Sequence, residues 1–255
     1  MNISSLFDLT DKVAVVTGAT RGIGKGLATA LAAAGARVVV VSRHGEDCER
    51  ATQEIVAKGG QALPVAADVS QLEAVADMVS TVLAAWGKID ILVNNAGTAV
   101  TKRAEDLTVE EWHQVLDTNL TGVFLCCQTV GRHMIMRRTG KIINVGSVLA
   151  FVAERQVLPY CASKGGVLQL TRALALEWAR YNVQVNALFP GYIETDLNRE
   201  QLADEYIRDR ILRKIPMRRL GTVDDLVGAI IFLSSPASDY MTGQVLVIDG
   251  GWLAE

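Results

Sequence analysis

The stretch Y-C-A-S-K places a tyrosine and a lysine four residues apart, at Tyr160 and Lys164. On a helix, residues with this spacing lie on the same face, one turn apart. A free phenol has a pKa of about 10, so it exchanges protons at neutral pH only when a nearby cation favours its charged form. The Lys164 ammonium could supply that cation. The spacing therefore predicts that Tyr160 is a general acid/base.

A third candidate, Ser147, ends the run K-I-I-N-V-G-S, thirteen residues before Tyr160. The run is typical of a buried strand, and the carboxyl ends of such strands form the edge at which open α/β sheets bind ligands. There the Ser147 hydroxyl could hold the oxygen of a ketone that receives a hydride and then a proton from Tyr160. Taken alone, Y-x-x-x-K also occurs by chance on many helices, so the alternative is that Tyr160 and Lys164 are ordinary residues of an amphipathic helix.

A glycine-rich turn, T-G-A-T-R-G-I-G over residues 17–24, gives the pair its context. Its glycines follow the spacing G-x3-G-x-G and let the backbone approach a pyrophosphate, which the free N–H groups of a helix N-terminus would bind. The alternative is a turn that serves packing only, but its place directly after a first buried strand favours a dinucleotide site. The candidate residues of this turn are Gly18, Thr20, Arg21, Gly22, Ile23 and Gly24.

The end of the second predicted strand indicates which dinucleotide binds. A carboxylate there would accept hydrogen bonds from the adenosine ribose, but the strand ends in Ser42 and Arg43, with no acid at its tip. Arg43, helped by Arg21, offers a guanidinium fork suited to a 2′-phosphate. NADP(H) is therefore favoured over NAD(H), although the nearby Glu46 and Asp47 leave open that Arg43 is a solvated loop residue.

Two further strand ends carry candidate cofactor contacts. Asp68 could accept a hydrogen bond from the adenine amine, with Val69 beside the ring. The stretch N-N-A-G ends the fourth predicted strand, and its residues Asn95, Ala96 and Gly97 could support the backbone beside a cofactor. The same four residues are also typical of a simple turn.

Short β-branched runs that alternate with longer helical patterns position these residues. Continuous apolar strands indicate a parallel sheet covered on both faces. Because no Pro/Gly/Ser-rich linker interrupts the alternation, residues 1–255 are predicted to form one α/β domain, a Rossmann-type doubly wound parallel sheet of about seven strands with helices on both faces. The predicted strands are 12–17, 37–42, 62–69, 89–95, 141–147, 183–190 and 244–251, and the predicted helical regions are 24–35, 46–58, 71–86, 108–138, 160–180, 196–213 and 222–234.

The least sheet-like segment, residues 192–216, is predicted to be a substrate lid, since long excursions from a compact domain usually carry function. Polar side chains in this lid and ahead of Tyr160 suit a hydroxylated or anionic substrate. The alternative is that these loops are polar because they meet water. The candidates are Glu154, Arg155, Gln156, Asn198 and Arg199.

Composition argues against several other function classes. A formal net charge of −3 gives no general attraction to nucleic acid or anionic lipid. The four cysteines form no CxxC pair and the three histidines are scattered, so no metal site or disulfide framework is expected. The longest uncharged run, 118–131, is too short to span a membrane, and the first residues lack the features of a secretory signal. We therefore expect a small-molecule substrate, no nucleic-acid or membrane partner, and a cytoplasmic location.

Together, these motifs resemble those of the short-chain dehydrogenase/reductase family over essentially the whole chain. Further matching stretches are D-T-N-L, P-G-Y-I-E-T over 190–195 and the terminal I-D-G-G. The resemblance implies an enzyme that interconverts a secondary alcohol and a ketone, with Tyr160 as acid/base, Ser147 orienting the carbonyl, and Lys164 binding the nicotinamide ribose while lowering the tyrosine pKa.

The same resemblance adds roles that the spacing alone does not suggest. Asn119 would hold a water that relays protons from Lys164 to solvent; the alternative is a helix-interior amide with a structural hydrogen bond. Family members usually form tetramers, so a homotetramer is expected. The implied nicotinamide contacts are Tyr160, Lys164, Pro190, Gly191, Ile193 and Thr195.

Stretches outside the site indicate the substrate class. The opening L-F-D-L-T-D-K-V and the terminal A-S-D-Y-M-T-G-Q-V-L-V-I-D-G-G-W-L-A are similar to bacterial sugar-acid dehydrogenases of the gluconate 5-dehydrogenase and 2-deoxygluconate 3-dehydrogenase types, which favours a sugar acid or polyol. The alternatives are a 3-oxoacyl-(acyl-carrier-protein) reductase or a general carbonyl reductase. Two arginines would dock an acyl carrier; Arg138 matches one, but Tyr181 stands in place of the other, with Arg180 adjacent. A non-catalytic nucleotide-sensing protein would be expected to lose Tyr160 or Lys164, and this chain keeps both.

Overall fold

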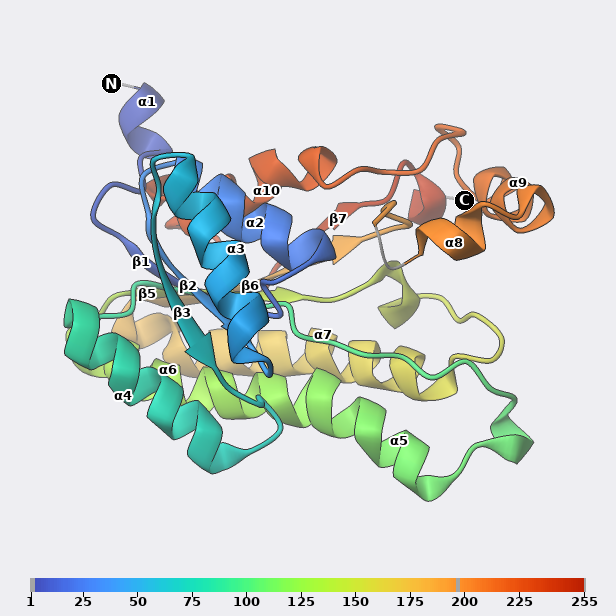
Figure 1. The fold of residues 1–255 in the computed structure, drawn as a ribbon, viewed down its shortest axis with the longest axis horizontal. Coiled ribbons are helices and arrows are strands. Elements are labelled where there is room, and N and C mark those ends of the chain that lie inside the picture. The colour runs from blue at the N-terminus through green and yellow to red at the C-terminus, as the bar shows by residue number, and fades with distance from the viewer. Residues whose placement is uncertain (1–2, 196–197, 255) are drawn as a thin grey trace.

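Seven strands form one parallel sheet in the computed structural model, which describes residues 3–195 and 198–254 (Figure 1). They are β1 (Val13–Thr17), β2 (Arg37–Ser42), β3 (Gln61–Ala66), β4 (Ile91–Asn94), β5 (Gly140–Val145), β6 (Val183–Pro190) and β7 (Val245–Ile248). Their order across the sheet is β3-β2-β1-β4-β5-β6-β7, and every neighbouring pair is parallel. The predicted doubly wound sheet is therefore confirmed.

Helices cover both faces of the sheet (Figure 1). One face carries α2 (Gly22–Ala33), α3 (Gly45–Ala57) and α10 (Asp224–Ser234); the other carries α4 (Leu72–Trp86), α6 (Gly122–Arg137) and α7 (Leu158–Trp178), with α5 (Val109–Leu116) leading into α6. The remaining helices are α1 (Ile3–Leu6), α8 (Arg199–Leu202) and α9 (Glu205–Arg213). No helix within the described residues combines the length and the apolar character that crossing a bilayer requires.

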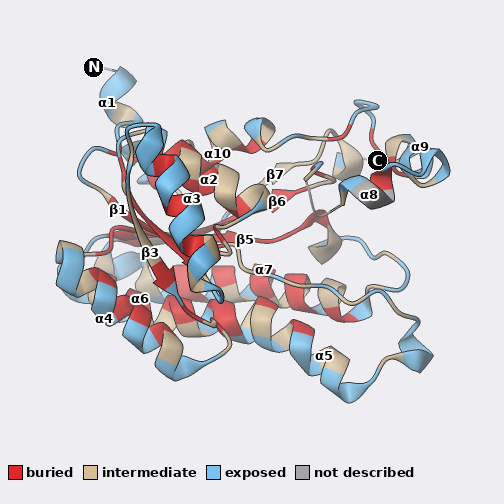
Figure 2. Cartoon of the chain, in the orientation of Figure 1, coloured by how far each residue is buried: buried red, intermediate tan, exposed pale blue. Residues whose placement is uncertain are grey.

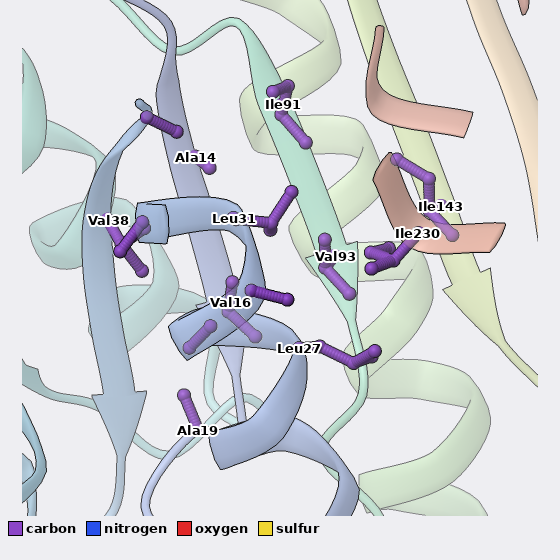
Figure 3. Close-up of a cluster of buried hydrophobic side chains, with 14 of the residues drawn as sticks. Ala14, Val16, Ala19, Leu27, Leu31, Val38, Ile91, Val93, Ile143 and Ile230 are labelled. Atoms are coloured by element: carbon purple, nitrogen blue, oxygen red, sulfur yellow. The ribbon is translucent and has the colours of Figure 1, made fainter. Parts of the chain in front are cut away.

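The strands are apolar along both faces because helices cover both. In β1, Ala14 and Val16 pack on the side of α2 and α10, whereas Val13 and Val15 pack on the side of α4, α6 and α7. Figure 2 shows that the buried residues run along the strands and the inward faces of the helices, and Figure 3 shows Leu27 of α2 among the first of these two clusters. Burying each valine or leucine side chain of this kind contributes about 1.5–3 kcal/mol, so both layers stabilise the sheet.

The strand order reverses at β1, which pairs with β2 on one side and with β4 on the other. The chain passes from β1 outward to β2 and β3 and then returns to β4 on the opposite side. The carboxyl ends of β1 and β4, at Thr17 and Asn94, therefore lie beside each other. A crevice at such a switch point is where open α/β sheets bind ligands.

The region predicted as helical over 108–138 contains two α-helices joined by a π-helical turn. Thr108 begins α5 with a capping box, in which its side chain accepts from the Glu111 backbone and the Glu111 carboxylate accepts from the Thr108 backbone. The π-helical turn, Asp117–Thr121, then adds a residue before α6 and holds the buried Asn119. Such turns inside helices are frequent at functional sites.

Three predictions about element boundaries are wrong. The seventh strand, predicted over 244–251, ends at Ile248, because the Asp249 side chain accepts from the backbone of Gly251 and Leu253 and begins a turn. The third strand ends at Ala66 and not at residue 69, because the Asp68 side chain accepts from the Ser70 backbone and begins a turn. The helical stretch predicted over 196–213 is split into α8 and α9. Asp204 accepts hydrogen bonds from the backbone of Tyr206 and Ile207, which starts a new helix at that point.

The segment predicted as a lid, 192–216, has an apolar core of its own. Its positions 196–197 lie outside the described residues. The cluster joins both short helices to the chain on either side, with partly buried Tyr192, Ile207 and Leu212 packed against it. Its buried members are Leu202, Ile211, Ile215 and Leu220.

Candidate active site

Tyr160 and Lys164 lie on the first two turns of α7, which begins with Leu158 and Pro159. The Lys164 ammonium lies 5.4 Å from the centre of the Tyr160 ring. It is buried, with 4% of the residue exposed, and it donates a 2.9 Å hydrogen bond to the Val145 carbonyl at the end of β5. Burial lowers the pKa of Lys164 to about 8, because the neutral amine tolerates the loss of water better than the ammonium.

Ser147 follows β5 and faces Tyr160. Its hydroxyl accepts a 3.1 Å hydrogen bond from the Leu149 backbone. Desolvation by the surrounding protein raises the pKa of Tyr160, and a side-chain hydrogen bond with Ser147 lowers it only in part. The sequence led us to expect a lowered value through Lys164. The chain's own groups favour instead the neutral phenol, which is the form that gives a proton to an alkoxide.

Asn119 is fully buried and holds two segments together. Its side-chain oxygen accepts from the Thr98 backbone at 2.8 Å, and its amide donates to the Thr98 carbonyl at 2.9 Å and to the Ser163 hydroxyl at 3.2 Å. Ser163 in turn donates to the Tyr160 carbonyl at 2.8 Å. The structural hydrogen bond considered from the sequence is therefore present, and through it Asn119 fixes the turn of α7 that carries Tyr160 and Lys164.

The glycine turn after β1 has the shape that a phosphate site needs. Gly18 and Gly22 have φ angles of +64° and +53°, in the left-handed region that favours glycine. A Cβ added to Gly24 would lie 2.1 Å from the Gly18 carbonyl oxygen, so only glycine fits there. The residues therefore fit a pyrophosphate placed against the first N–H groups of α2, with Thr20, Arg21 and Ile23 completing the turn.

The N-N-A-G stretch supports this turn directly. The Asn95 side-chain amide donates to the Thr17 and Gly18 carbonyls at 3.0 and 3.1 Å. The Thr17 hydroxyl accepts from the backbone N–H groups of Asn95 and Ala96, both at 3.0 Å. Gly97 is exposed beside Asn119. The end of β4 thus clamps the end of β1 at the switch point.

The expected adenosine end is open and positively charged. Arg21 and Arg43 are both exposed, and neither forms an ion pair with a carboxylate of the described residues. Ser42 ends β2 and accepts a 3.4 Å hydrogen bond from the His44 backbone. Asp68 uses one oxygen to cap its own turn, and Val69 is buried against Gly122 of α6.

The stretch after β6 lies against β7 and the lid. The Gly191 backbone donates to the Ile248 carbonyl at 2.9 Å, and a Cβ at Gly191 would come within 2.8 Å of the Asp249 backbone. Ile193, three residues after Pro190, is buried and pairs with Gly221. The lid residue Asn198 accepts hydrogen bonds from the backbone and the hydroxyl of Thr195.

A family model described as enoyl-(acyl carrier protein) reductase matches residues 18–253, nearly all of the chain. The chain belongs to the short-chain dehydrogenase/reductase family. It is similar to the gluconate 5-dehydrogenase of Gluconobacter oxydans (strain 621H), with 42% identity over 98% of each chain. It is also similar to the 3-oxoacyl-[acyl-carrier-protein] reductase of Synechocystis sp. (strain ATCC 27184 / PCC 6803 / Kazusa), with 41% identity over 95% of this chain and 97% of the relative.

Solved structures agree with this placement. The gluconate 5-dehydrogenase of Burkholderia cenocepacia J2315, crystallised in complex with NADP and tartrate, superposes with a TM-score of 0.96 and 40% identity over 100% of both chains. The short-chain dehydrogenase/reductase described here is therefore an oxidoreductase with the Rossmann-like fold of its family.

The arginine considered for docking an acyl carrier is engaged within this short-chain dehydrogenase/reductase. Arg138 ends α6 in a left-handed conformation, and its guanidinium donates to the Arg180 carbonyl at 3.0 Å. The Arg180 guanidinium lies 4.7 Å from the centre of the Tyr181 ring. Both arginines remain exposed, but the Arg138 guanidinium links the end of α6 to the turn Ala179–Tyr181 that follows α7.

Sequence reasoning missed three residues near the reacting end of this short-chain dehydrogenase/reductase: Tyr192, Lys214 and Trp252. Of the predicted pocket residues, Glu154 contacts Lys214, whereas Arg155 and Gln156 are exposed. Tyr192 lies inside the P-G-Y-I-E-T motif, which was a usable signal. No local pattern marks Lys214 or Trp252, because their contacts join distant segments.

Proposed function

We propose that this enzyme uses NADP(H) to interconvert a secondary alcohol and a ketone, with a sugar acid or polyol as the substrate class, as in the gluconate 5-dehydrogenases. The observation that carries the proposal is the juxtaposition of Ser147, Tyr160 and Lys164 at the carboxyl end of β5, in the same parallel sheet whose β1 ends in the clamped glycine turn. These residues supply a carbonyl-holding hydroxyl, a neutral phenol and a buried cation at the ligand-binding edge of the sheet.

The four residues Ser147, Tyr160, Lys164 and Asn119 have separate roles in this reaction. The Ser147 hydroxyl donates to the substrate oxygen, and Tyr160 gives its proton to that oxygen as the alkoxide develops. Lys164 holds the cofactor ribose and stabilises the tyrosinate that remains. Asn119, through Ser163, keeps the helix turn in place, beside the water relay that the family resemblance implies. Bound NADP(H) supplies the hydride in reduction and accepts it in oxidation.

The preference for NADP(H) rests on the adenosine end. No carboxylate ends β2, and the exposed Arg21 and Arg43 can receive a 2′-phosphate. The related Burkholderia cenocepacia structure contains NADP. Asp68 and Val69 would flank the adenine, and Pro190, Gly191, Ile193 and Thr195 would line the nicotinamide.

The sugar-acid class is favoured by the gluconate dehydrogenase relatives. We infer that residues 192–216 form the lid over this substrate. A 3-oxoacyl-(acyl-carrier-protein) reductase is the second candidate, since one relative has that name. It is disfavoured because Tyr181 stands where a second docking arginine is expected, and because the Arg138 guanidinium donates to the Arg180 carbonyl. A nucleotide-sensing protein without catalysis is disfavoured because Tyr160, Lys164 and Ser147 are all present.

We also infer a homotetramer. Large apolar side chains are exposed along the helices of the α4–α7 face, where a second copy would cover them. Size-exclusion chromatography with light scattering tests this directly: a single species of four chains is expected, and a stable monomer would contradict it. These side chains are Val109, Phe124, Met136 and Leu176.

The experiment that tests the proposal is a substrate panel with both cofactors. Oxidation of NADPH would be followed with 5-keto-D-gluconate, a neutral ketose and an acetoacetyl thioester. We expect turnover of the keto acid with a clear preference for NADPH over NADH. Turnover of the thioester alone would favour the second candidate, and no turnover of any ketone would contradict the enzyme reaction proposed here.

A further inference from the structure

Four side chains from separate segments meet in one cluster: Glu154, Tyr192, Lys214 and Trp252. The rings of Tyr192 and Trp252 stack with their centres 5.2 Å apart and their planes 9° from parallel. The Lys214 ammonium lies 5.2 Å from the centre of the Trp252 ring. It also lies 2.5 Å from a carboxylate oxygen of Glu154. We call these four residues the Lys214 cluster.

The Lys214 cluster adjoins the reacting end of the site. Glu154 belongs to the segment between Ser147 and Tyr160, and Tyr192 directly follows the Pro-Gly pair after β6. Tyr192 is close enough to Tyr160 to contribute to its raised pKa. Among the described residues, the Tyr192 hydroxyl has no hydrogen-bond partner, so it can bind a ligand group.

The charges of this region favour an anion. Lys214 has three N–H donors, Glu154 accepts one of them, and 35% of the Lys214 side chain is exposed. Arg210, four residues earlier on α9, also acts on Tyr192 and lowers its pKa, against the larger effects of burial and of Glu154, which raise it. Lys214 therefore keeps donors that a second carboxylate can accept, while the nearby Asp249 carboxylate already accepts from the backbone of Gly251 and Leu253.

We propose that Lys214 binds the carboxylate of the keto acid whose ketone oxygen lies at Ser147 and Tyr160, while the Tyr192 hydroxyl binds a hydroxyl group of the same substrate. The proposal rests on the proposed function, because it requires a substrate that carries a carboxylate. Glu154 and the Trp252 ring hold the ammonium in place, the one by an ion pair and the other by a cation–π contact. A charge-assisted hydrogen bond at this position would select acids over neutral ketoses.

The test compares two ketones in the full-length enzyme with NADPH. One is 5-keto-D-gluconate, and the other is a neutral ketose in which a hydroxymethyl group replaces the carboxylate. We expect Lys214→Gln to raise the KM for the keto acid by about tenfold or more and to change the KM for the neutral ketose by less than about twofold. Lys214→Arg, which keeps the charge, should recover most of the loss.

Arg213→Gln is the matched control, since it removes one positive charge from the adjacent, exposed lid position. It should change neither KM. If Lys214→Gln raises both KM values equally, the cluster only holds the lid; if it changes neither, Lys214 does not meet the substrate. Both results overturn the proposal. Wild-type enzyme that turns over the neutral ketose but no keto acid would overturn this proposal and leave the proposed function standing. Turnover of the thioester alone, or of no ketone, would contradict the proposed function itself, and either result is seen before any variant is made.

Discussion

The Lys164 ammonium lies one helical turn from Tyr160, 5.4 Å from the centre of its ring, with a hydrogen bond to the Val145 carbonyl. This arrangement keeps a cation beside the phenol, and no carboxylate of the described residues pairs with it. Removing the phenol hydroxyl should therefore remove the proton donor and leave the fold intact.

Tyr160→Phe should lower kcat/KM for ketone reduction by about 10²- to 10⁴-fold, the range typical of general acid–base catalysis. The Kd for NADPH, measured by fluorescence titration, should stay within about twofold of wild type, because the variant retains Lys164 and the glycine turn. A variant with full activity would contradict the role of Tyr160.

The pH dependence of reduction should report Lys164, whose pKa is lowered to about 8. The ammonium form, which stabilises the tyrosinate, exists below that value and is lost as the pH rises through it. We therefore expect kcat/KM to fall with an apparent pKa of about 8. Lys164→Arg, with a guanidinium that stays charged, should have lower activity but no fall in this range. Identical pH profiles for the two enzymes would show that the titration of Lys164 does not cause the fall in kcat/KM.

Arg43→Ala should raise the KM for NADPH by about tenfold and change the KM for NADH little, because only NADPH carries the phosphate that Arg43 would bind. Arg50→Ala is the control: this exposed arginine on α3 pairs with Asp47, and its loss should affect both cofactors alike or neither. Equal effects of Arg43→Ala on the two cofactors would contradict the phosphate assignment.

Gly24→Ala should abolish measurable NADPH binding or prevent folding, because its Cβ would lie 2.1 Å from the Gly18 carbonyl. Gly228→Ala provides a matched helix glycine, since a Cβ there meets nothing within 4 Å. It should raise the free energy of unfolding by up to about 1 kcal/mol through helix propensity. Circular dichroism melting separates a loss of folding from a loss of binding. Wild-type NADPH affinity in Gly24→Ala would contradict the proposed role of the glycine turn.

Local patterns explain what the sequence could predict. The apolar runs of the strands, the glycines of the turn after β1 and the Tyr160–Lys164 spacing each depend on neighbours within a few residues, so they are readable without a structure. The end of β3 was misplaced because a single Asp68 side chain competes there with strand pairing. The hydrophobic pattern of the sequence therefore does not show where the strand ends.

Contacts between distant segments could not be predicted in this way. Glu154 and Lys214 are 60 residues apart, and the stacking of Tyr192 on Trp252 depends on how the lid packs against the end of β7. Polar residues in a loop do not recur at a regular spacing, so the sequence does not show which residues they will contact. The sequence therefore indicated the polar character of the pocket but not the side chains that meet in it.

The position of β7 has a consequence for the order in which the protein can fold during synthesis. β7 pairs with β6, and the segment after it supplies Trp252 for the stack and the Gly250 carbonyl that accepts from the Met217 backbone. A ribosome releases this segment after every other part of the site. The glycine turn and the N-N-A-G contacts that support it can form while translation continues. The Lys214 cluster forms only once residues 245–254 have emerged. A nascent chain stalled before residue 245 should therefore form the glycine turn, where we propose that the nucleotide binds, without the Lys214 cluster, which we propose selects the substrate.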